Sequence, residues 1–150
     1  MSEWELDDYR HPIEALDDAP REIIRSEEQL RSRLHTLKDD GEQGVFILSS
    51  PENECLQIGI GPTFGFLHWK NIAMGYGGSA MASREDATEE EYFLFEGITK
   101  EIDPEELLPV DDVIEAAVYF FANGNLSTKF SWEIWNPNTK KWEVRQEKAE

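Results

Sequence analysis

Residues 107–124 read LLPVDDVIEAAVYFFANG, the most strongly periodic stretch of the chain. Its apolar residues recur at the i, i+3, i+4 and i+7 spacing of a single helix face. Pro109 suits a helix start, where its missing N–H is not needed, and Asn123-Gly124 supplies the left-handed residues that end a helix. We therefore predict a helix over Val110–Ala122, about 20 Å long. The side chains expected to face a sheet are Val113, Ala117 and Phe121.

A second helix is predicted nearer the start of the chain. Ser26-Glu27-Glu28-Gln29 has the S-x-x-Q spacing of a capping box. Leu30, Leu34 and Leu37 then lie on one helical face, which predicts a helix over Glu27–Lys38. Its Arg and Lys residues are expected on the solvated side.

Short apolar or alternating runs separated by turn residues predict strands. The predicted strands are Val45–Leu48, Cys55–Ile60, Phe64–Lys70, Ile72–Tyr76, Tyr92–Phe95 and Lys129–Trp135, with Glu22–Arg25 and Lys141–Val144 as short candidates. We expect Ala80–Glu91 to be an exposed loop and Ile98–Leu108 to be the connector to the second predicted helix. Consecutive strands joined by tight turns form antiparallel sheets. The sequence therefore predicts an α+β fold with a single antiparallel sheet of about five to seven strands and two main helices packed on it. One sheet face should be covered by the helices and the other partly open.

The length of 150 residues fits one domain over 1–150. Residues 1–20 are acidic and show no sustained period, so we expect an N-terminal arm in a loop conformation. Residues 145–150 are expected to be a frayed tail. The N-terminus lacks the basic and apolar regions of a signal peptide, and no apolar run approaches a membrane span.

The charge is the dominant feature of the composition. The net charge of −18 disfavours nucleic acid and anionic membrane as partners and favours a basic protein, although it also simply confers solubility. Residues 101–125 contain no Lys or Arg but many acids, which predicts an acidic face. Cys55 is the only cysteine, so no internal disulfide forms, which fits a cytoplasmic protein.

No motif for enzyme chemistry is present. Gly75-Tyr76-Gly77-Gly78-Ser79 lacks the phosphate-loop pattern, and a flexible tip or a site of close backbone approach is the better interpretation. His11, His35 and His68 have no metal-ligand spacing to one another or to Cys55. We expect no catalytic residue, no cofactor and no metal site.

Several segments of the C-terminal half resemble immunity protein family one of the bacterial polymorphic toxin systems. They are Phe95-Glu96-Gly97, Leu108–Asp112, Ile114–Ala117, Phe120-Phe121 and Ser131-Trp132. The resemblance implies a non-enzymatic inhibitor that binds a cognate toxin domain. It further implies a basic deaminase or nuclease as partner, because the family includes the immunity protein of a DNA cytosine deaminase toxin. The expected arrangement is one immunity protein bound to one toxin domain.

Two other functions remain open: an acidic adaptor or nucleic-acid mimic that binds another basic protein, and a small hydrolase with a cryptic site. For the immunity function, we expect contacts from the acids near the glycine-rich stretch, because glycines allow close approach. Exposed aromatic residues would supply the apolar centre of the interface. The predicted toxin-binding residues are Trp69, Tyr76, Glu85, Asp86, Glu89, Glu90, Glu91 and Trp135.

Overall fold

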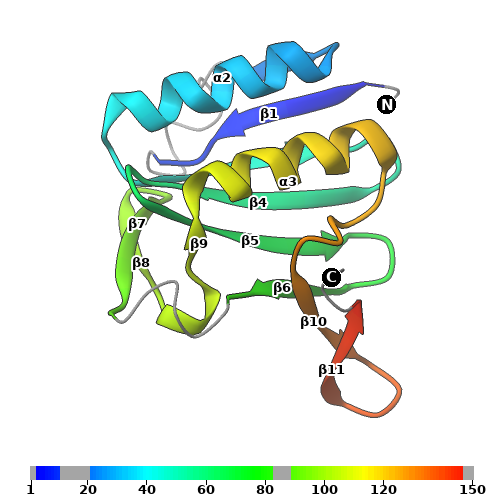
Figure 1. Cartoon of the computed structure of the whole chain (residues 1–150). Helices are drawn as coiled ribbons and strands as arrows, with labels where there is room; N and C mark the ends of the chain where they lie inside the picture. Colours follow the sequence, from blue (N-terminus) through cyan, green and yellow to red (C-terminus); the bar gives the residue numbers. More distant parts are fainter. Residues whose placement is uncertain (1–2, 11–20, 83–88, 147–150) are drawn as a thin grey trace.

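The computed structural model describes residues 3–10, 21–82 and 89–146, with the side chains of 144–146 also left undescribed. Two α-helices lie on one face of a sheet (Figure 1). In chain order the elements are β1 Trp4–Asp8, β2 Arg21–Ile24, α2 Glu27–Asp40, β3 Gly44–Ser49, β4 Glu54–Ile60, β5 Phe64–Asn71, β6 Tyr76–Met81, β7 Glu91–Phe95, β8 Ile98–Ile102, the 3-10 helix η1 Pro104–Glu106, β9 Leu108–Pro109, α3 Val110–Asn123, β10 Ser131–Asn136 and β11 Lys141–Gln146.

The described strands form one eleven-stranded sheet, more than the five to seven predicted. Its main path runs β11-β10-β6-β5-β4-β3-β1-β2, and neighbours on this path are antiparallel. The extra strands come from segments that we expected to be loops or connectors: β1, β8 and the two-residue β9. The α+β class and the covered and open faces are confirmed.

The predicted strand over Ile72–Tyr76 is wrong. Residues 72–75 form the turn after β5, and β6 begins only at Tyr76. Gly75 has φ +76°, which the turn requires and which glycine adopts without strain. The residues that we expected to begin an exposed loop therefore continue as a strand as far as Met81.

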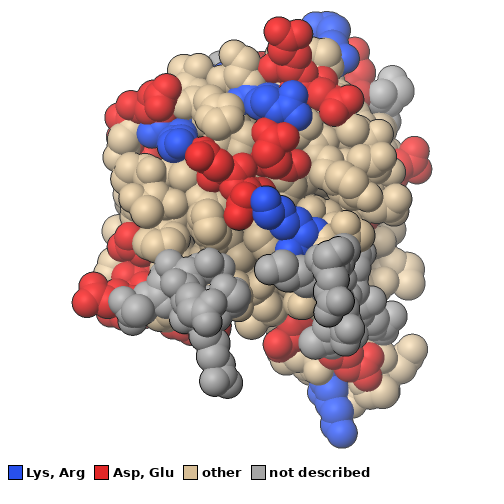
Figure 2. All heavy atoms as spheres, in the orientation of Figure 1, with Lys and Arg blue, Asp and Glu red and all other residues tan. Residues whose placement is uncertain are grey.

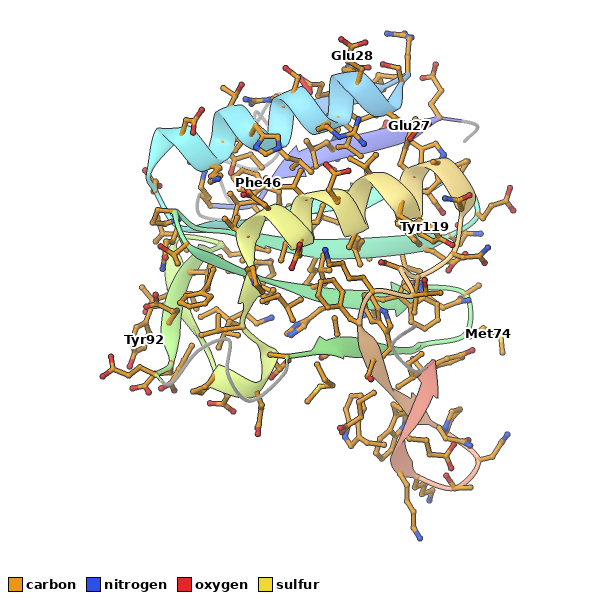
Figure 3. All side chains as sticks on the ribbon, in the orientation of Figure 1. Glu27, Glu28, Phe46, Met74, Tyr92 and Tyr119 are labelled. Atoms are coloured by element: carbon orange, nitrogen blue, oxygen red, sulfur yellow. The ribbon has the colours of Figure 1, made fainter. Side chains whose placement is uncertain are left out.

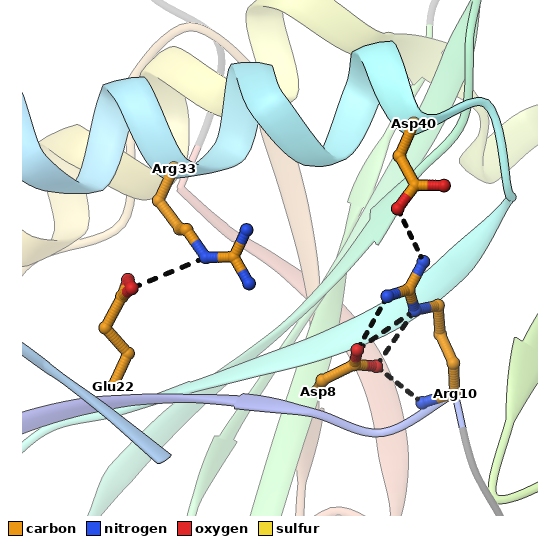
Figure 4. Close-up of polar contacts among 5 residues, drawn as sticks. All are labelled: Asp8, Arg10, Glu22, Arg33 and Asp40. Carbon is orange, nitrogen blue, oxygen red and sulfur yellow. Dashed lines mark hydrogen bonds and ion pairs between the residues drawn. The ribbon is translucent and has the colours of Figure 1, made fainter. Parts of the chain in front are cut away.

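Strand β1 corrects the expectation of a loop-like arm. It lies between β3 and β2 because Trp4 and Leu6 alternate with acids, so that Leu6 enters the core at 4% exposure. Just after β1, the Arg10 guanidinium binds Asp8 at 2.7 Å and Asp40 of α2 at 3.5 Å (Figure 4). It also lies 5.1 Å from the ring centre of Phe46 in β3. Arg10 therefore contacts both the helix layer and the sheet.

Both helices have the predicted positions. Ser26 accepts a hydrogen bond from the Gln29 N–H at the start of α2, as the capping box predicts. In α3, Val113 and Ala117 are fully buried, but Phe121 is only partly buried. The fully buried aromatic residue of α3 is Phe120. Trp4 of β1 packs edge-on against the rings of both Phe120 and Phe121.

The other sheet face is partly covered by the hairpin of β7 and β8. Its turn residues Glu96 and Gly97 have φ +55° and +83°, the left-handed pair that a type I′ hairpin requires. The hairpin and η1 enclose a second, smaller core, formed by Val45, Phe66, Phe93, Ile102 and Leu107. The rest of this face stays open between this hairpin and the hairpin of β10 and β11 (Figure 1).

Candidate functional site

The open sheet face contains a hollow of about 340 Å³. Strands β4, β5 and β6 form its floor, Lys100 of β8 lies on one side and Trp142 of β11 on another. We call it the open-face hollow. Its lining residues are Gln57, His68, Trp69, Lys70, Gly75, Tyr76, Gly77, Gly78, Ser79, Lys100 and Trp142.

Two glycines in the floor are needed for strand packing rather than for a partner. A Cβ at Gly77 would overlap the Trp69 carbonyl oxygen, and one at Gly78 would overlap the Glu133 carbonyl oxygen. The close approach predicted at this glycine-rich stretch is therefore made by neighbouring strands of the same sheet. It leaves a floor that is mainly backbone beneath the hollow.

At the edge of the hollow, the Glu106 carboxylate forms hydrogen bonds with two side chains. The His68 Nε2 donates to Glu106 Oε1 at 2.7 Å, and Ser79 also hydrogen-bonds this carboxylate. These bonds, chiefly that from His68, hold the pKa of Glu106 below its usual value. Because His68 and Ser79 engage the same carboxylate, His68 is not positioned as a base for a serine nucleophile.

Cys55 is also poorly suited to nucleophilic chemistry. It is buried, and burial raises the pKa of its thiol, so the reactive thiolate is disfavoured. Among the described residues, no group of three or more His, Cys, Asp or Glu side chains is arranged to hold a metal ion.

The acids of α3 do not form the acidic face predicted from their sequence. Bases of α2 and of the loop before β10 lie beside them, and Figure 2 shows blue and red side chains interleaved over the helices. The ion pairs are Lys38–Asp111 at 2.7 Å, Arg31–Glu115 at 2.8 Å and Lys129–Asp112 at 2.7 Å. The basic residues that sequence analysis assigned to a solvated helix face thus neutralise the neighbouring helix.

Acids without ion pairs occur in several parts of the described chain, and one group of them lies around β7 and β8. Two large apolar side chains lie exposed among them, Tyr92 at 51% and Ile98 at 69%. Figure 3 shows Tyr92 directed away from the body of the molecule. We call this region the acidic hairpin surface; its acids are Glu89, Glu90, Glu91, Glu96, Glu101, Asp103 and Glu105.

The structure distributes the predicted toxin-binding residues over three places. Trp69 packs edge-on against Tyr76 near the β5–β6 turn, with ring centres 5.7 Å apart. Trp135 packs against Trp142 at 5.5 Å on the β10–β11 hairpin. The acids Glu89, Glu90 and Glu91 lie at β7, on the opposite side of Figure 1 from the β5–β6 turn, so they do not join Trp69 and Tyr76 in one patch. Glu85 and Asp86 lie outside the described residues.

Sequence reasoning missed four residues that the structure makes prominent. Tyr92 and Ile98 were assigned to a strand and a connector, and only their exposure singles them out. Lys100 and Trp142 belong to β8 and β11, which reach the open-face hollow only through sheet topology. Residues 98–102 read ITKEI and do not alternate, so no local pattern marked this strand.

None of the helices in the described part of the chain is long and apolar enough to cross a membrane. No curated protein matches the sequence. The model of a protein family described as immunity protein Imm1 matches residues 18–133, which covers α2, α3, the strands from β2 to β9 and the start of β10. This match covers most of the chain and includes the segments on which the resemblance was based. The chain therefore belongs to the Imm1 family of immunity proteins.

Proposed function

We propose that the protein neutralises its cognate toxin by docking the acidic hairpin surface against the basic active-site cleft of the toxin domain. Membership of the Imm1 family makes it an immunity protein for a toxin. The finer proposal is a non-enzymatic inhibitor that forms a one-to-one complex in the cytoplasm and blocks access of substrate. A deaminase or nuclease domain suits this role, because a cleft that binds nucleic acid is basic.

The observation that carries the proposal is the grouping of acids without ion pairs around exposed apolar side chains at β7 and β8. The acids of α3 are each paired with a nearby base, so they present little net charge to a partner. The acids around β7 and β8 have no such bases and surround exposed Tyr92 and Ile98. An apolar centre with charged groups around it is the usual anatomy of a specific interface.

The charged and the apolar side chains should affect different steps of toxin binding. Peripheral acids act at long range, so they chiefly raise the association rate and make it depend on salt. Tyr92 makes a 3.4 Å hydrogen bond to Glu101 and leaves much of its ring exposed, so it can pack against the partner at contact. Loss of the Tyr92 ring should therefore speed dissociation more than it slows association.

The test begins with co-expression and co-purification of the protein with the C-terminal domain of the large protein encoded beside it. Association rates are then measured for the Glu90→Lys/Glu101→Lys variant. We expect them to fall on the order of tenfold at low salt and to depend less on salt than in the wild type. Glu28→Lys/Glu52→Lys is the matched control, because it makes the same charge change at exposed acids of α2 and of the turn between β3 and β4.

Circular dichroism confirms that each variant is folded. If both double variants associate equally slowly, only the total charge matters and the acidic hairpin surface is not the docking site. If both associate at the wild-type rate, the toxin binds elsewhere. Failure of the wild-type protein to bind any toxin domain, with a basic non-toxin protein recovered instead, would favour the adaptor function.

A further inference from the structure

The open-face hollow contains an ammonium group without an ion-pair partner in the described chain. Lys100 extends from β8 over the rings of Phe66 and Phe95, with its Nζ 5.6 and 5.3 Å from their centres. Its Nζ donates a hydrogen bond to Gln57 Oε1 at 3.3 Å. In a chain with 32 acidic residues, this half-buried lysine forms no ion pair within the described residues.

The surroundings of Lys100 favour an anion. Lys70 lines the same hollow, and no Asp or Glu is among its lining residues. The Glu106 carboxylate is close enough to interact electrostatically with Lys100, but it forms its hydrogen bonds with His68 and Ser79. The wall on one side is Trp142, which is 54% exposed and offers a flat apolar surface. The hollow therefore combines positive charge, amide and hydroxyl groups and an exposed ring.

We propose that the open-face hollow receives a carboxylate side chain of the toxin domain, held by Lys100 and Lys70 and covered by Trp142. This inference rests on the proposed function and adds a second kind of contact to it. The protein would bind basic groups of the toxin with its acids around β7 and β8, and an acidic group of the toxin with the lysines of the hollow. A volume of about 340 Å³ accommodates one or two side chains rather than a whole element. A nucleic-acid ligand is disfavoured, because the net charge of −18 repels a polyanion.

The unfavourable environment of the charged Lys100 side chain supports a binding role. Burial lowers the pKa of this lysine, which means that the charged form is less favourable here than in water. Its apolar stem alone would fill the space over the two rings. Replacing Lys100 by Met keeps that stem and removes the charge, so a purely structural role predicts a more stable and fully active protein.

The first test uses a small probe and does not depend on the toxin. The amide resonances of Gln57, Ser79 and Lys100 are followed by NMR during titration with N-acetyl-glutamate amide at constant ionic strength. We expect saturable shifts for the wild type and for Lys100→Arg, and none for Lys100→Met. The glutamine analogue, which lacks the charge, should give no shift with any variant. Equal shifts with both probes, or no shifts in the hollow, would overturn the proposal.

The second test measures the dissociation constant of the complex with the co-purified toxin domain. Lys100→Met should weaken binding roughly tenfold while raising the melting temperature, and Lys100→Arg should restore most of the affinity. Lys129→Met is the matched control, because it removes one positive charge on the helix side, where Lys129 pairs with Asp112. Unchanged affinity in Lys100→Met, together with slower association in Glu90→Lys/Glu101→Lys, would overturn the carboxylate contact and leave the acidic docking surface standing.

Discussion

Replacing Phe120 by Ala should destabilise the protein far more than replacing its neighbour Phe121. Phe120 is 1% exposed within the main core, whereas Phe121 is only partly buried. Truncation of a fully buried Phe costs about 3–5 kcal/mol, because the apolar burial of the ring is lost and a cavity is left in its place. For a domain of this size, such a loss lowers the melting temperature by roughly 6–20 °C. Phe121→Ala should cost about 1–2 kcal/mol, because part of its ring already contacts water.

Trp4 provides an internal check on this prediction. Its ring packs edge-on against both phenylalanines, with ring centres 5.3 Å apart in each case. A double-mutant cycle between Trp4→Ala and Phe120→Ala should give a coupling energy of about 0.5–1.5 kcal/mol. Urea unfolding followed by circular dichroism measures all four proteins. If Phe121→Ala proves the more costly change, or if Trp4 and Phe120 are not coupled, then the phase of α3 or the packing of β1 is wrong.

Three further changes test the fold around the site. Glu106→Gln should cost about 1–2 kcal/mol at neutral pH. Because the folded pKa of Glu106 is lowered by His68, this difference should be complete above about pH 5 and vanish as the pH falls through that lowered value, as urea titrations across pH will show. Gly44→Ala would place a Cβ against the Arg10 side chain and should cost about 1–3 kcal/mol, with partial rescue by Arg10→Ala in the double variant. Ser26→Ala removes the cap of α2 and should lower the unfolding free energy by about 1 kcal/mol, whereas Ser26→Asp should retain it.

The parts of the fold that follow from local pattern could be predicted from the sequence. The helix periodicity of Val110–Asn123, the cap at Ser26 and the short apolar strands all reflect interactions between near neighbours in the chain. Strand β1 was missed because its acids were weighed above the alternation of Trp4 and Leu6. Strand β6 was misplaced because Gly77 and Gly78 have weak strand propensity and are held by pairing with β5 and β10 on either side.

The candidate site was harder to predict, for a physical reason. The groups around the open-face hollow come from β4, β5, β6, β8 and β11, which only the sheet order brings together. The ion pairs between α2 and α3 likewise join residues more than seventy positions apart, so sequence alone could not show that the α3 acids are neutralised. The prediction that acids near β7 contact a toxin stays a prediction, now with Tyr92 and Ile98 as the exposed apolar groups beside them.

The glycine-rich strand β6 also matters while the protein is being synthesised. Strands β3 to β6 follow one another through short turns and can pair early, but β10, the other neighbour of β6, begins only at Ser131. Until the ribosome has released that segment, the outer edge of β6 has no partner in the sheet, and such edges promote aggregation of nascent chains. Glycines weaken an edge as a template for another strand. We therefore expect Gly77 and Gly78 to protect the growing polypeptide, and replacing them with β-branched residues should reduce the yield of native protein during translation in addition to crowding the finished sheet.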